Sequence, residues 1–361
     1  MAKKTIFLVG ADTGGHVVPV FALAEDLLSD KNVRVVVIGV GSAVEKKFYQ
    51  KLSGIEYKII IAGKFQFKSV WNNCVAVIKS AVGFFQSIGL VLKYRPSVVF
   101  LKGNYATVPV AYAARILGVP IFAHESDAII GKSNKLISKF ARKLFVSYPE
   151  DFFRSDLRNL DYSGPILRPE YSKKIKNYDK NLLPTLLILG GSQGAHAINE
   201  IIFAAISELA SSYQVIHQTG SADLKKAEKT KNELAKEISK NYLPSAFIDN
   251  DFELIAKVDL IVSRASSSIF EFAAFSKPVI LIPYPYASLD HQMANARYFA
   301  SRDAAILLEE KAITPAIIYS AISKILSSEK RKKELGDNLN KSVKLGGEKI
   351  IINELSKFVR K

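Results

Sequence analysis

Cysteine is almost absent from this sequence, since Cys74 is the only one in 361 residues. A single cysteine excludes an intrachain disulfide and a metal cage built from cysteine ligands, and it is typical of a reducing, cytoplasmic compartment. The N-terminus also lacks a long apolar run, because only five apolar or small residues separate Thr5 from Ala11. We therefore expect no signal peptide, whose apolar region is longer than this.

Acidic residues are scarce relative to basic ones: 34 Asp and Glu stand against 50 Lys and Arg, which gives a net charge of +16. Such an excess attracts nucleic acid, an anionic membrane surface or a phosphorylated substrate. The sequence has neither an aromatic RNA-binding motif nor zinc-finger spacing. Its densest basic cluster, residues 330–333, lies in a polar helical stretch that is typical of a solvated face. We therefore expect no nucleic-acid partner, and favour a membrane surface or a phosphorylated substrate.

Short runs rich in Val, Ile and Leu alternate twice with longer helical patterns. They are residues 5–10, 33–39, 57–61, 97–101, 120–123 and 144–148, and then 185–189, 214–217, 258–262 and 279–283. Continuous apolar runs between helices are typical of parallel strands buried on both faces. The pattern predicts an α/β protein of two doubly wound, Rossmann-like domains facing a cleft. We place them at 1–163 and 164–361, with a linker at about 161–184 and a last helix able to pack on the first domain.

One segment, residues 75–92, is apolar enough to be weighed as a membrane span. Its polar residues fall on one side of a helical wheel, which a spanning helix does not require. The pattern predicts an amphipathic helix that either packs on the sheet or turns part of its apolar face to lipid. The lipid-facing residues would be Phe84, Phe85 and Ile88, with Lys64, Lys68, Lys79 and Lys93 around them.

The first apolar run ends in a glycine loop that carries a histidine. Residues 10–16 read Gly-Ala-Asp-Thr-Gly-Gly-His, and a helix is expected from about Val20 with Pro19 in its first turn. A strand, a glycine loop and a helix present backbone N–H groups and a positive helix end to an anion. His16 is either a general base at the cleft or a residue that caps the loop by hydrogen bonds.

A second glycine loop follows the run 185–189. Residues 190–195 read Gly-Gly-Ser-Gln-Gly-Ala, and a helix is expected from about His196 to Ala210. Ser192 and the N–H groups after it can hold a diphosphate, with a tight turn alone as the alternative. The loop lacks the Gly-Lys-Ser/Thr of a P-loop, which disfavours ATP hydrolysis.

Polar side chains follow three further strands. Ser266–Ser268 can cap a helix or bind phosphate, and Glu271 can accept hydrogen bonds from a ribose diol. Gln292 and Asn295 suit sugar hydroxyls, with solvated side chains as the alternative. Residues 122–127 read Phe-Ala-His-Glu-Ser-Asp and are followed by Asn134. Such groups at the carboxyl ends of parallel strands face the ligand crevice.

All five histidines, at positions 16, 124, 196, 217 and 291, lie in or beside these loops. Packing alone does not predict that clustering. No two of them have the spacing of metal ligands on a helix or turn. We therefore expect chemistry at the loops without a metal cofactor.

Taken in order, the motifs resemble those of MurG-type UDP-N-acetylglucosamine:lipid I transferases, glycosyltransferase family 28. The resemblance covers nearly the whole chain and rests on the ordered set rather than on any single motif. Its members are residues 10–16, 124–127 with Asn134, 190–195 with Asn199, 217–220 (His-Gln-Thr-Gly), 247–249 (Phe-Ile-Asp), 263–271 and 291–297.

The resemblance implies a GT-B fold and an inverting transfer of GlcNAc without a cofactor. The donor would be UDP-GlcNAc, and the acceptor would be the 4-hydroxyl of MurNAc in undecaprenyl-diphospho-MurNAc-pentapeptide (lipid I), which yields lipid II for peptidoglycan synthesis. The enzyme would lie peripherally on the anionic cytoplasmic face of the cell membrane.

The resemblance also implies residue roles. His16 would be the catalytic base. The substrate-binding residues would be Thr13, Gly14, Gly15, Glu125, Asp127, Asn134, Arg168, Ser192, Gln193, Gly194, Asn199, Ile248, Arg264, Ser266, Ser267, Ser268, Ile269, Phe270, Glu271, Gln292 and Asn295. Asp127 stands where many members have Asn.

Three other functions fit parts of the pattern. A sister glycosyltransferase acting on diacylglycerol or another polyprenyl lipid would share the second-domain motifs. A UDP-GlcNAc 2-epimerase would share the architecture and need acidic residues such as Glu125 or Asp127 to move a proton. A scaffold without activity would bind a nucleotide sugar or a membrane only.

Overall fold

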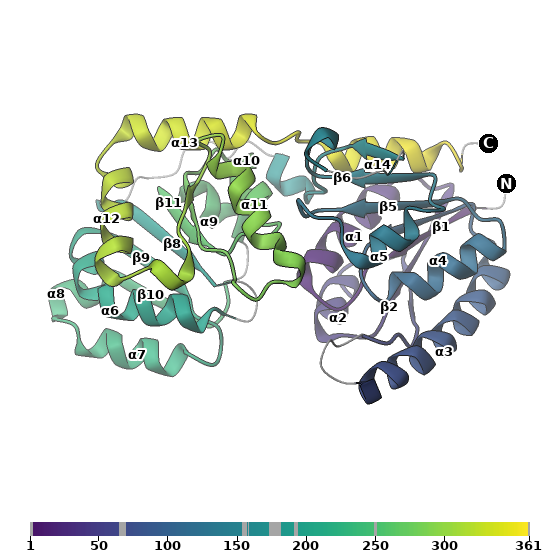
Figure 1. Ribbon diagram of the computed structural model, residues 1–361, viewed down its shortest axis with the longest axis horizontal. Coiled ribbons are helices and arrows are strands. Elements are labelled where there is room, and N and C mark those ends of the chain that lie inside the picture. The colour runs from purple at the N-terminus through teal and green to yellow at the C-terminus, as the bar shows by residue number, and fades with distance from the viewer. Residues whose placement is uncertain are drawn as a thin grey trace. The chain divides into compact units, whose positions relative to one another are not determined.

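The computed structural model of the chain describes residues 3–64, 70–153, 157, 159–172, 182–190, 194–248 and 251–359. These residues form two compact units, each around its own sheet (Figure 1). The first unit is Met1–Pro169 with Lys344–Lys361, and the second is Glu170–Val343. The last helix, α14 (Gly347–Ser356), therefore belongs to the first unit.

The first unit contains a parallel seven-stranded sheet in the order β3-β2-β1-β4-β5-β6-β7. Its strands are β1 (Lys4–Val9), β2 (Val33–Gly39), β3 (Glu56–Ile59), β4 (Val98–Lys102), β5 (Ile121–Glu125), β6 (Lys143–Val146) and β7 (Leu160–Tyr162). Its other helices are α1 (Gly14–Leu27), α2 (Ala43–Tyr49), α3 (Val70–Tyr94), α4 (Thr107–Ile116), α5 (Lys132–Ile137) and the 3-10 turn η1 (Glu150–Phe152). The 3-10 turn η2 (Pro169–Ser172) begins at the last residue of the segment Met1–Pro169 and continues into the second unit.

The central strands of this sheet are buried on both faces. Every residue of β4 is buried, and so are residues 5–9 of β1. Ile6 and Leu8 share one apolar cluster with Val20 of α1 and Ile351 of α14. Helices thus cover a sheet whose strands read as continuous apolar runs, which confirms the predicted doubly wound arrangement.

The second unit contains a parallel six-stranded sheet in the order β10-β9-β8-β11-β12-β13. Its strands are β8 (Thr185–Leu189), β9 (Gln214–Gln218), β10 (Tyr242–Ser245), β11 (Leu260–Ser263), β12 (Val279–Leu281) and β13 (Ile306–Leu307). Its helices are α6 (His196–Ser212), α7 (Leu224–Glu233), α8 (Lys236–Ser239), α9 (Asp251–Lys257), α10 (Ile269–Ala274), η3 (Ser288–Asp290), α11 (His291–Ala300), η4 (Glu310–Ala312), α12 (Pro315–Leu326) and α13 (Glu329–Lys341).

Each predicted apolar run coincides with a strand, but β7, β10 and β13 were not predicted. These three lie at or next to the ends of the sheets, where strands are short and less apolar. Strand β10, for instance, contains Pro244, which an edge strand tolerates. The strand β7 also occupies the start of the segment that we predicted to be a linker.

The predicted start of the first helix is wrong. Helix α1 begins at Gly14 and carries Pro19 in its interior, rather than in its first turn. Glycine and proline both weaken a helix in isolation. Here Val17 and Val20 are fully buried, and this packing outweighs the weak local preference.

Helix α3 is the amphipathic helix expected around residues 75–92, and within the described residues it alone is long and apolar enough to cross a membrane. Its buried stripe is narrow and runs through Ala76, Gly83, Ser87 and Val91. The stripe uses small residues because the chain before the helix packs closely against it. A methyl group on Gly83 would lie 1.9 Å from the carbonyl oxygen of Ile61. Much of the apolar surface of α3 is therefore left outside the core.

Candidate active site

Both sheets place their functional loops at the carboxyl ends of the strands. In each sheet the strand order reverses once, between β1 and β4 in the first unit and between β8 and β11 in the second. Ligands of open parallel sheets bind at such reversal points. The loops that follow β1 and β8 are the two glycine loops identified from the sequence, so the fold brings each of them to the expected edge of its own sheet.

In the loop between β1 and α1, a threonine hydroxyl lies within hydrogen-bond distance of the histidine that was predicted to be catalytic. Oγ1 of Thr13 lies 2.9 Å from Nδ1 of His16, and the backbone N–H of His16 donates to the carbonyl of Thr13. Gly10 allows α1 to start this close, since a methyl group there would lie 2.5 Å from the carbonyl oxygen of His16. The imidazole of His16 is half-buried. It is therefore oriented by its own loop and still accessible to a substrate.

Residues far along the chain hold this loop in place. Asn104, after β4, donates its side-chain N–H to the carbonyl of Ala11 at 2.6 Å. Tyr49 donates its hydroxyl to the carbonyl of Gly10 at 2.9 Å. Neither residue was predicted to belong to the site, because each acts through a backbone atom and has no motif of its own.

The glutamate of the 124–127 motif is buried and holds the loop after β5. The carboxylate of Glu125 accepts hydrogen bonds from the backbone N–H groups of Ser126, Asp127 and Gly131, and from the side chain of Asn134. Burial and the neighbouring Asp127 carboxylate raise the pKa of Glu125. Its geometry favours loop support over the substrate contact predicted from the sequence.

Asn134 has the same supporting role. It is buried, and its side-chain N–H groups donate to the carbonyl of His124 and to Glu125 at 3.0 Å each. It also packs against Gly103, where a methyl group would lie 2.3 Å from the amide. The amide thus ties the end of β4 to the end of β5, and half-buried Asp127 stands at the loop that they support.

A buried lysine joins this cluster and was not predicted. Nζ of Lys102, the last residue of β4, donates to Oγ of Ser126 at 2.7 Å. Burial lowers the pKa of Lys102, while the carboxylates of Glu125 and Asp127 raise it. The sequence signal for Lys102 was a single cation at the end of an otherwise apolar strand.

Two of the five histidines are packing residues, so the prediction that packing does not explain them is wrong for this pair. His124 and His217 are fully buried. Nε2 of His124 lies 3.1 Å from the carbonyl oxygen of Gly164. Burial, and then the charge of Lys102, lower the pKa of His124 well below its usual range, so the ring is neutral. Buried strand ends account for the placement of both residues.

In the second unit, Gly194 of the loop after β8 lies against the loop after β9. Gly194 has a φ of +80°, and a methyl group there would lie 2.4 Å from the carbonyl oxygen of Thr219. Only glycine fits both the backbone conformation and this close approach. The predicted diphosphate residues Ser192 and Gln193 lie outside the described residues, so their role stays a prediction.

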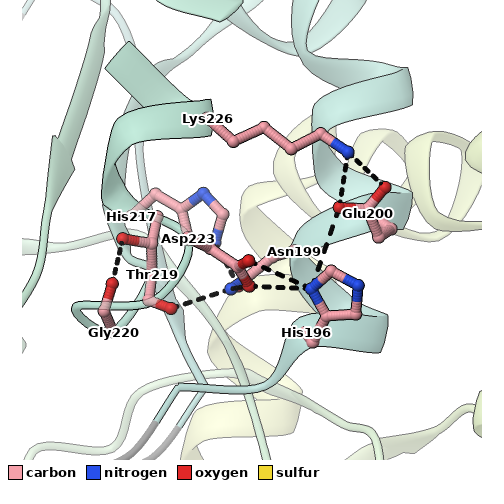
Figure 2. A network of polar contacts seen from close by, with 8 residues as sticks. All are labelled: His196, Asn199, Glu200, His217, Thr219, Gly220, Asp223 and Lys226. Atoms are coloured by element: carbon pink, nitrogen blue, oxygen red, sulfur yellow. Dashed lines mark hydrogen bonds and ion pairs between the residues drawn. The ribbon is translucent and has the colours of Figure 1, made fainter. Parts of the chain in front are cut away.

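The loop after β9 is fixed by the polar network drawn in Figure 2. The side-chain N–H groups of Asn199 donate to the carbonyl of Thr219 at 2.8 Å and to Asp223 at 2.7 Å. Oδ1 of Asn199 lies 3.0 Å from Nε2 of His217. Asn199 is fully buried. It therefore shapes the loop beside Gly194, and the substrate contact expected of it would be indirect.

The surface side of the same network contains charged groups. His196, at the start of α6, lies 3.0 Å from the carboxylate of Asp223, and Lys226 pairs with Glu200 (Figure 2). Burial raises the pKa of Asp223, but the hydrogen bonds from Asn199 and His196, together with the charges of His196 and Lys226, lower the pKa overall. Asp223 thus links the exposed side chain of His196 to the buried amide of Asn199.

The loop after β11 combines a buried arginine with accessible hydroxyls. Arg264 donates to the carbonyls of Ile282 and Pro283 and pairs with Glu310 at 2.5 Å. It is only 8% exposed. These contacts favour support of the segment after β12 over the ligand contact predicted for Arg264.

The hydroxyls of Ser266 and Ser268 in this loop lie 2.7 Å apart, and Ser266–Ser268 and Glu271 are all half-buried. They are therefore placed where a ligand can reach them. Ile269 and Phe270 are buried in the core, so only their backbone can face a ligand.

The amides on α11 divide between two roles. Asn295 is fully buried, and its side chain donates to the carbonyl of Ala265 at 3.0 Å. Gln292 is half-buried and accepts a hydrogen bond from the backbone N–H of Tyr284. Asn295 thus supports the serine loop, whereas Gln292 is positioned to reach a ligand.

Two residues predicted to contact the nucleotide-sugar substrate, Ile248 and Arg168, lie outside these loops. Half-buried Ile248 follows β10, and its backbone N–H donates to the side-chain oxygen of Gln218 at 3.0 Å. Half-buried Arg168 precedes η2 and belongs to the first unit. Their contacts with a ligand stay predictions.

The first unit offers the oriented imidazole of His16 at a helix N-terminus. The second unit offers backbone N–H groups, the hydroxyls of Ser266–Ser268, the carboxylate of Glu271 and the amide of Gln292. Within the described part of the chain, no three His, Cys, Asp or Glu side chains gather as a metal site would require. These groups suit the binding of an anionic, hydroxyl-rich ligand and the removal of one proton.

Comparison with known proteins covers both units. Residues 6–146 match the glycosyltransferase family 28 N-terminal domain, and residues 185–350 match the glycosyltransferase family 28 C-terminal domain. Proteins named UDP-N-acetylglucosamine--N-acetylmuramyl-(pentapeptide) pyrophosphoryl-undecaprenol N-acetylglucosamine transferase are similar over their full length. The protein from Treponema denticola is 33% identical, with 96% of this chain and 95% of that protein covered. The protein from Desulforamulus reducens is 31% identical, with 98% and 97% covered.

Solved structures share the fold. The crystal structure of MurG from Acinetobacter baumannii has a TM-score of 0.76 at 23% identity, covering 98% of this chain and 99% of that one. A UDP-N-acetylglucosamine 2-epimerase has a TM-score of 0.69 at 12% identity, with 98% and 96% covered. The fold alone therefore does not separate transfer from epimerisation, whereas the full-length sequence similarity does.

Proposed function

Because the chain belongs to glycosyltransferase family 28, we propose that its two units carry out the transfer for which its relatives are named. The enzyme moves N-acetylglucosamine from UDP-GlcNAc to the N-acetylmuramyl-pentapeptide of a pyrophosphoryl-undecaprenol acceptor, a step of peptidoglycan synthesis. The observation that carries this function is the full-length match to relatives that are named for this reaction. Neither the diacylglycerol transferase nor the epimerase is favoured by those relatives.

We assign the proton transfer to His16. If the N–H at Nδ1 of His16 donates a hydrogen bond to Oγ1 of Thr13, Nε2 carries the lone pair that accepts a proton from the acceptor 4-hydroxyl. The 4-oxygen then attacks the anomeric carbon of GlcNAc from the face opposite the diphosphate. The new C–O bond forms as the bond to UDP breaks, and UDP leaves with that electron pair. The product linkage is β.

We assign the binding of the donor to the second unit. The start of α6 and the loop around Gly194 offer backbone N–H groups to the diphosphate, which becomes more negative as the bond breaks. The hydroxyls of Ser266–Ser268 lie at the end of β11, beside the strand β8 that carries the glycine loop. Glu271 suits the ribose hydroxyls and Gln292 suits the sugar.

We place the enzyme against the cytoplasmic face of the membrane through α3. Large apolar side chains of this helix face solvent, with Trp71 80%, Phe85 72% and Ile78 64% exposed. Of the residues expected to face lipid, Phe85 is exposed, whereas Phe84 and Ile88 are half-buried. The exposed set lies with Lys79 and Lys93 on one helix, which suits an anionic lipid surface.

The function is tested with purified protein, radiolabelled UDP-GlcNAc and three acceptor conditions: lipid I, diacylglycerol, or no lipid. We expect label to enter the lipid I product alone, with a β-(1→4) linkage by NMR. Label in diacylglycerol would favour the sister transferase. Conversion of UDP-GlcNAc to its 2-epimer without lipid would favour the epimerase.

A further inference from the structure

A fully buried carboxylate lies behind the loop that carries His16. Glu45, in α2, has no exposed surface, and its Oε1 accepts the backbone N–H of Asp12 at 2.8 Å. Its Oε2 accepts the backbone N–H groups of Val40 at 2.9 Å and Gly41 at 3.0 Å. Both oxygens are thus used to join the loop after β1 to the loop after β2.

The hydrogen bond to Asp12 supports a strained backbone. Asp12 has a φ of +77°, in the left-handed region that non-glycine residues rarely adopt. Such a conformation persists only where surrounding contacts impose it. Ser42, the N-cap residue of α2, also donates its hydroxyl to the carbonyl of Asp12 at 3.2 Å. Residues at the start of α2 therefore bind both the backbone N–H and the backbone carbonyl of Asp12, on either side of its strained conformation.

The space around Glu45 is built for a carboxylate. Gly39 is required beside it, since a methyl group there would lie 1.9 Å from Oε2. Tyr57 donates its hydroxyl to Oε2, and burial together with Glu45 raises the pKa of Tyr57. Tyr49, whose pKa is raised by burial and then by Glu45, donates to the carbonyl of Gly10 in the same loop.

Asp12 directly precedes Thr13, whose hydroxyl orients the imidazole of His16. We propose that Glu45 is a positioning residue for the transfer reaction, which holds Asp12 in its left-handed conformation and thereby sets Thr13 and His16 for catalysis. This inference rests on the proposed function. Glu45 touches no substrate and acts through the loop.

The test is a double-mutant cycle between Glu45→Gln and His16→Ala. An amide places an NH₂ group opposite at least one of the backbone N–H donors that Glu45 now satisfies. We expect Glu45→Gln to lower kcat about tenfold to a hundredfold, as misplacement of a catalytic group does, with the KM for UDP-GlcNAc unchanged. In the His16→Ala background, the same substitution should change kcat by less than about twofold.

Two further variants guard against a general folding defect. Gly39→Ala pushes on the carboxylate without removing it and should reproduce the fall in kcat. Glu56→Gln is the matched control, because Glu56 lies in the same unit and also accepts a tyrosine hydroxyl, from Tyr94 at 2.8 Å, but does not contact the loop. It should leave kcat unchanged.

Hydrogen exchange gives a readout that does not depend on activity. The amides of residues 10–16 should exchange faster in Glu45→Gln than in the wild type, and should be unchanged in Glu56→Gln. The inference is overturned if Glu45→Gln lowers kcat by the same factor in both backgrounds, if His16→Ala is fully active, or if exchange of residues 10–16 is unaltered. A wild type that transfers no GlcNAc would instead overturn the proposed function.

Discussion

Oδ1 of Asn199 lies 3.0 Å from Nε2 of His217, with both side chains fully buried. The other ring nitrogen, Nδ1, lies 3.0 Å from the hydroxyl of Tyr242. A neutral ring with its proton on Nε2 satisfies every partner, because Nε2 then donates to the amide oxygen and Nδ1 accepts from the tyrosine. The two buried polar groups that contact His217 are therefore matched to an uncharged histidine.

This match makes the second unit sensitive to acid. Burial lowers the pKa of His217 to about 3, whereas an unfolded histidine titrates near 6.5. Between these values the unfolded chain binds the extra proton, so stability is present above pH ~6.5 and falls as the pH drops towards 3. The slope from this group is about 1.4 kcal/mol per pH unit.

The measurement is the free energy of opening of strand β9, obtained by hydrogen exchange between pH 7.5 and 5. His217→Gln should flatten the fall, because the titrating group is gone, and His291→Gln at the half-buried start of α11 should not. Equal slopes in the wild type and in His217→Gln would contradict the assignment.

Asn199 should matter for donor binding through the loop that it holds. Asn199→Leu keeps the branched shape of the side chain but leaves the buried carbonyl of Thr219 and Nε2 of His217 without the partners that Asn199 supplies. We expect a loss of about 3 kcal/mol in unfolding free energy and a KM for UDP-GlcNAc about tenfold higher, because Thr219 packs against Gly194.

His196→Ala is the matched control for that prediction. His196 belongs to the same network, but its side chain is 74% exposed. An exposed pair contributes little, so its removal should change stability by less than about 0.5 kcal/mol and leave the KM unchanged. A similar KM for both variants would show that the loop does not shape the donor site.

The sequence predicted the sheets well because a buried parallel strand is encoded by a short apolar run of consecutive residues. The run 33–39, for example, forms β2 with the predicted bounds. The sequence also identified His16 and Gln292, in the first turns of α1 and α11, and Ser266 in the loop after β11, all of which are half-buried. It did not reveal that Glu125, Asn134 and Asn295 support loops, since a polar side chain that holds a loop and one that binds a ligand look alike in sequence, and their contacts with a ligand stay predictions. Lys102 and Glu45 were missed because their partners lie 24 and 33 residues away along the chain.

The pair formed by Thr13 and His16 predicts two distinct losses of activity. His16→Ala should lower kcat by about a hundredfold to ten-thousandfold, the usual range for a general base, with UDP-GlcNAc affinity unchanged. Thr13→Val removes the hydroxyl at nearly constant volume and should cost about tenfold in kcat, because the imidazole loses its orientation. Thr13→Ser keeps the hydroxyl and should retain most of the activity. Full turnover by His16→Ala would remove His16 from the chemistry.

Helix α3 should determine membrane binding without affecting the chemical step. Trp71 and Phe85 are among its most exposed apolar side chains, and burying each in the lipid interface removes apolar surface from water. The double variant Trp71→Lys/Phe85→Lys should bind anionic vesicles about tenfold or more weakly, while its kcat with a short-chain, soluble acceptor stays that of the wild type. Ile317→Lys, on the second unit, supplies the control, since Ile317 is also exposed but lies on α12. Because added lysines strengthen electrostatic attraction, weaker binding of the double variant would identify the apolar contact as the dominant one. Unchanged vesicle binding would place the membrane surface elsewhere on the molecule.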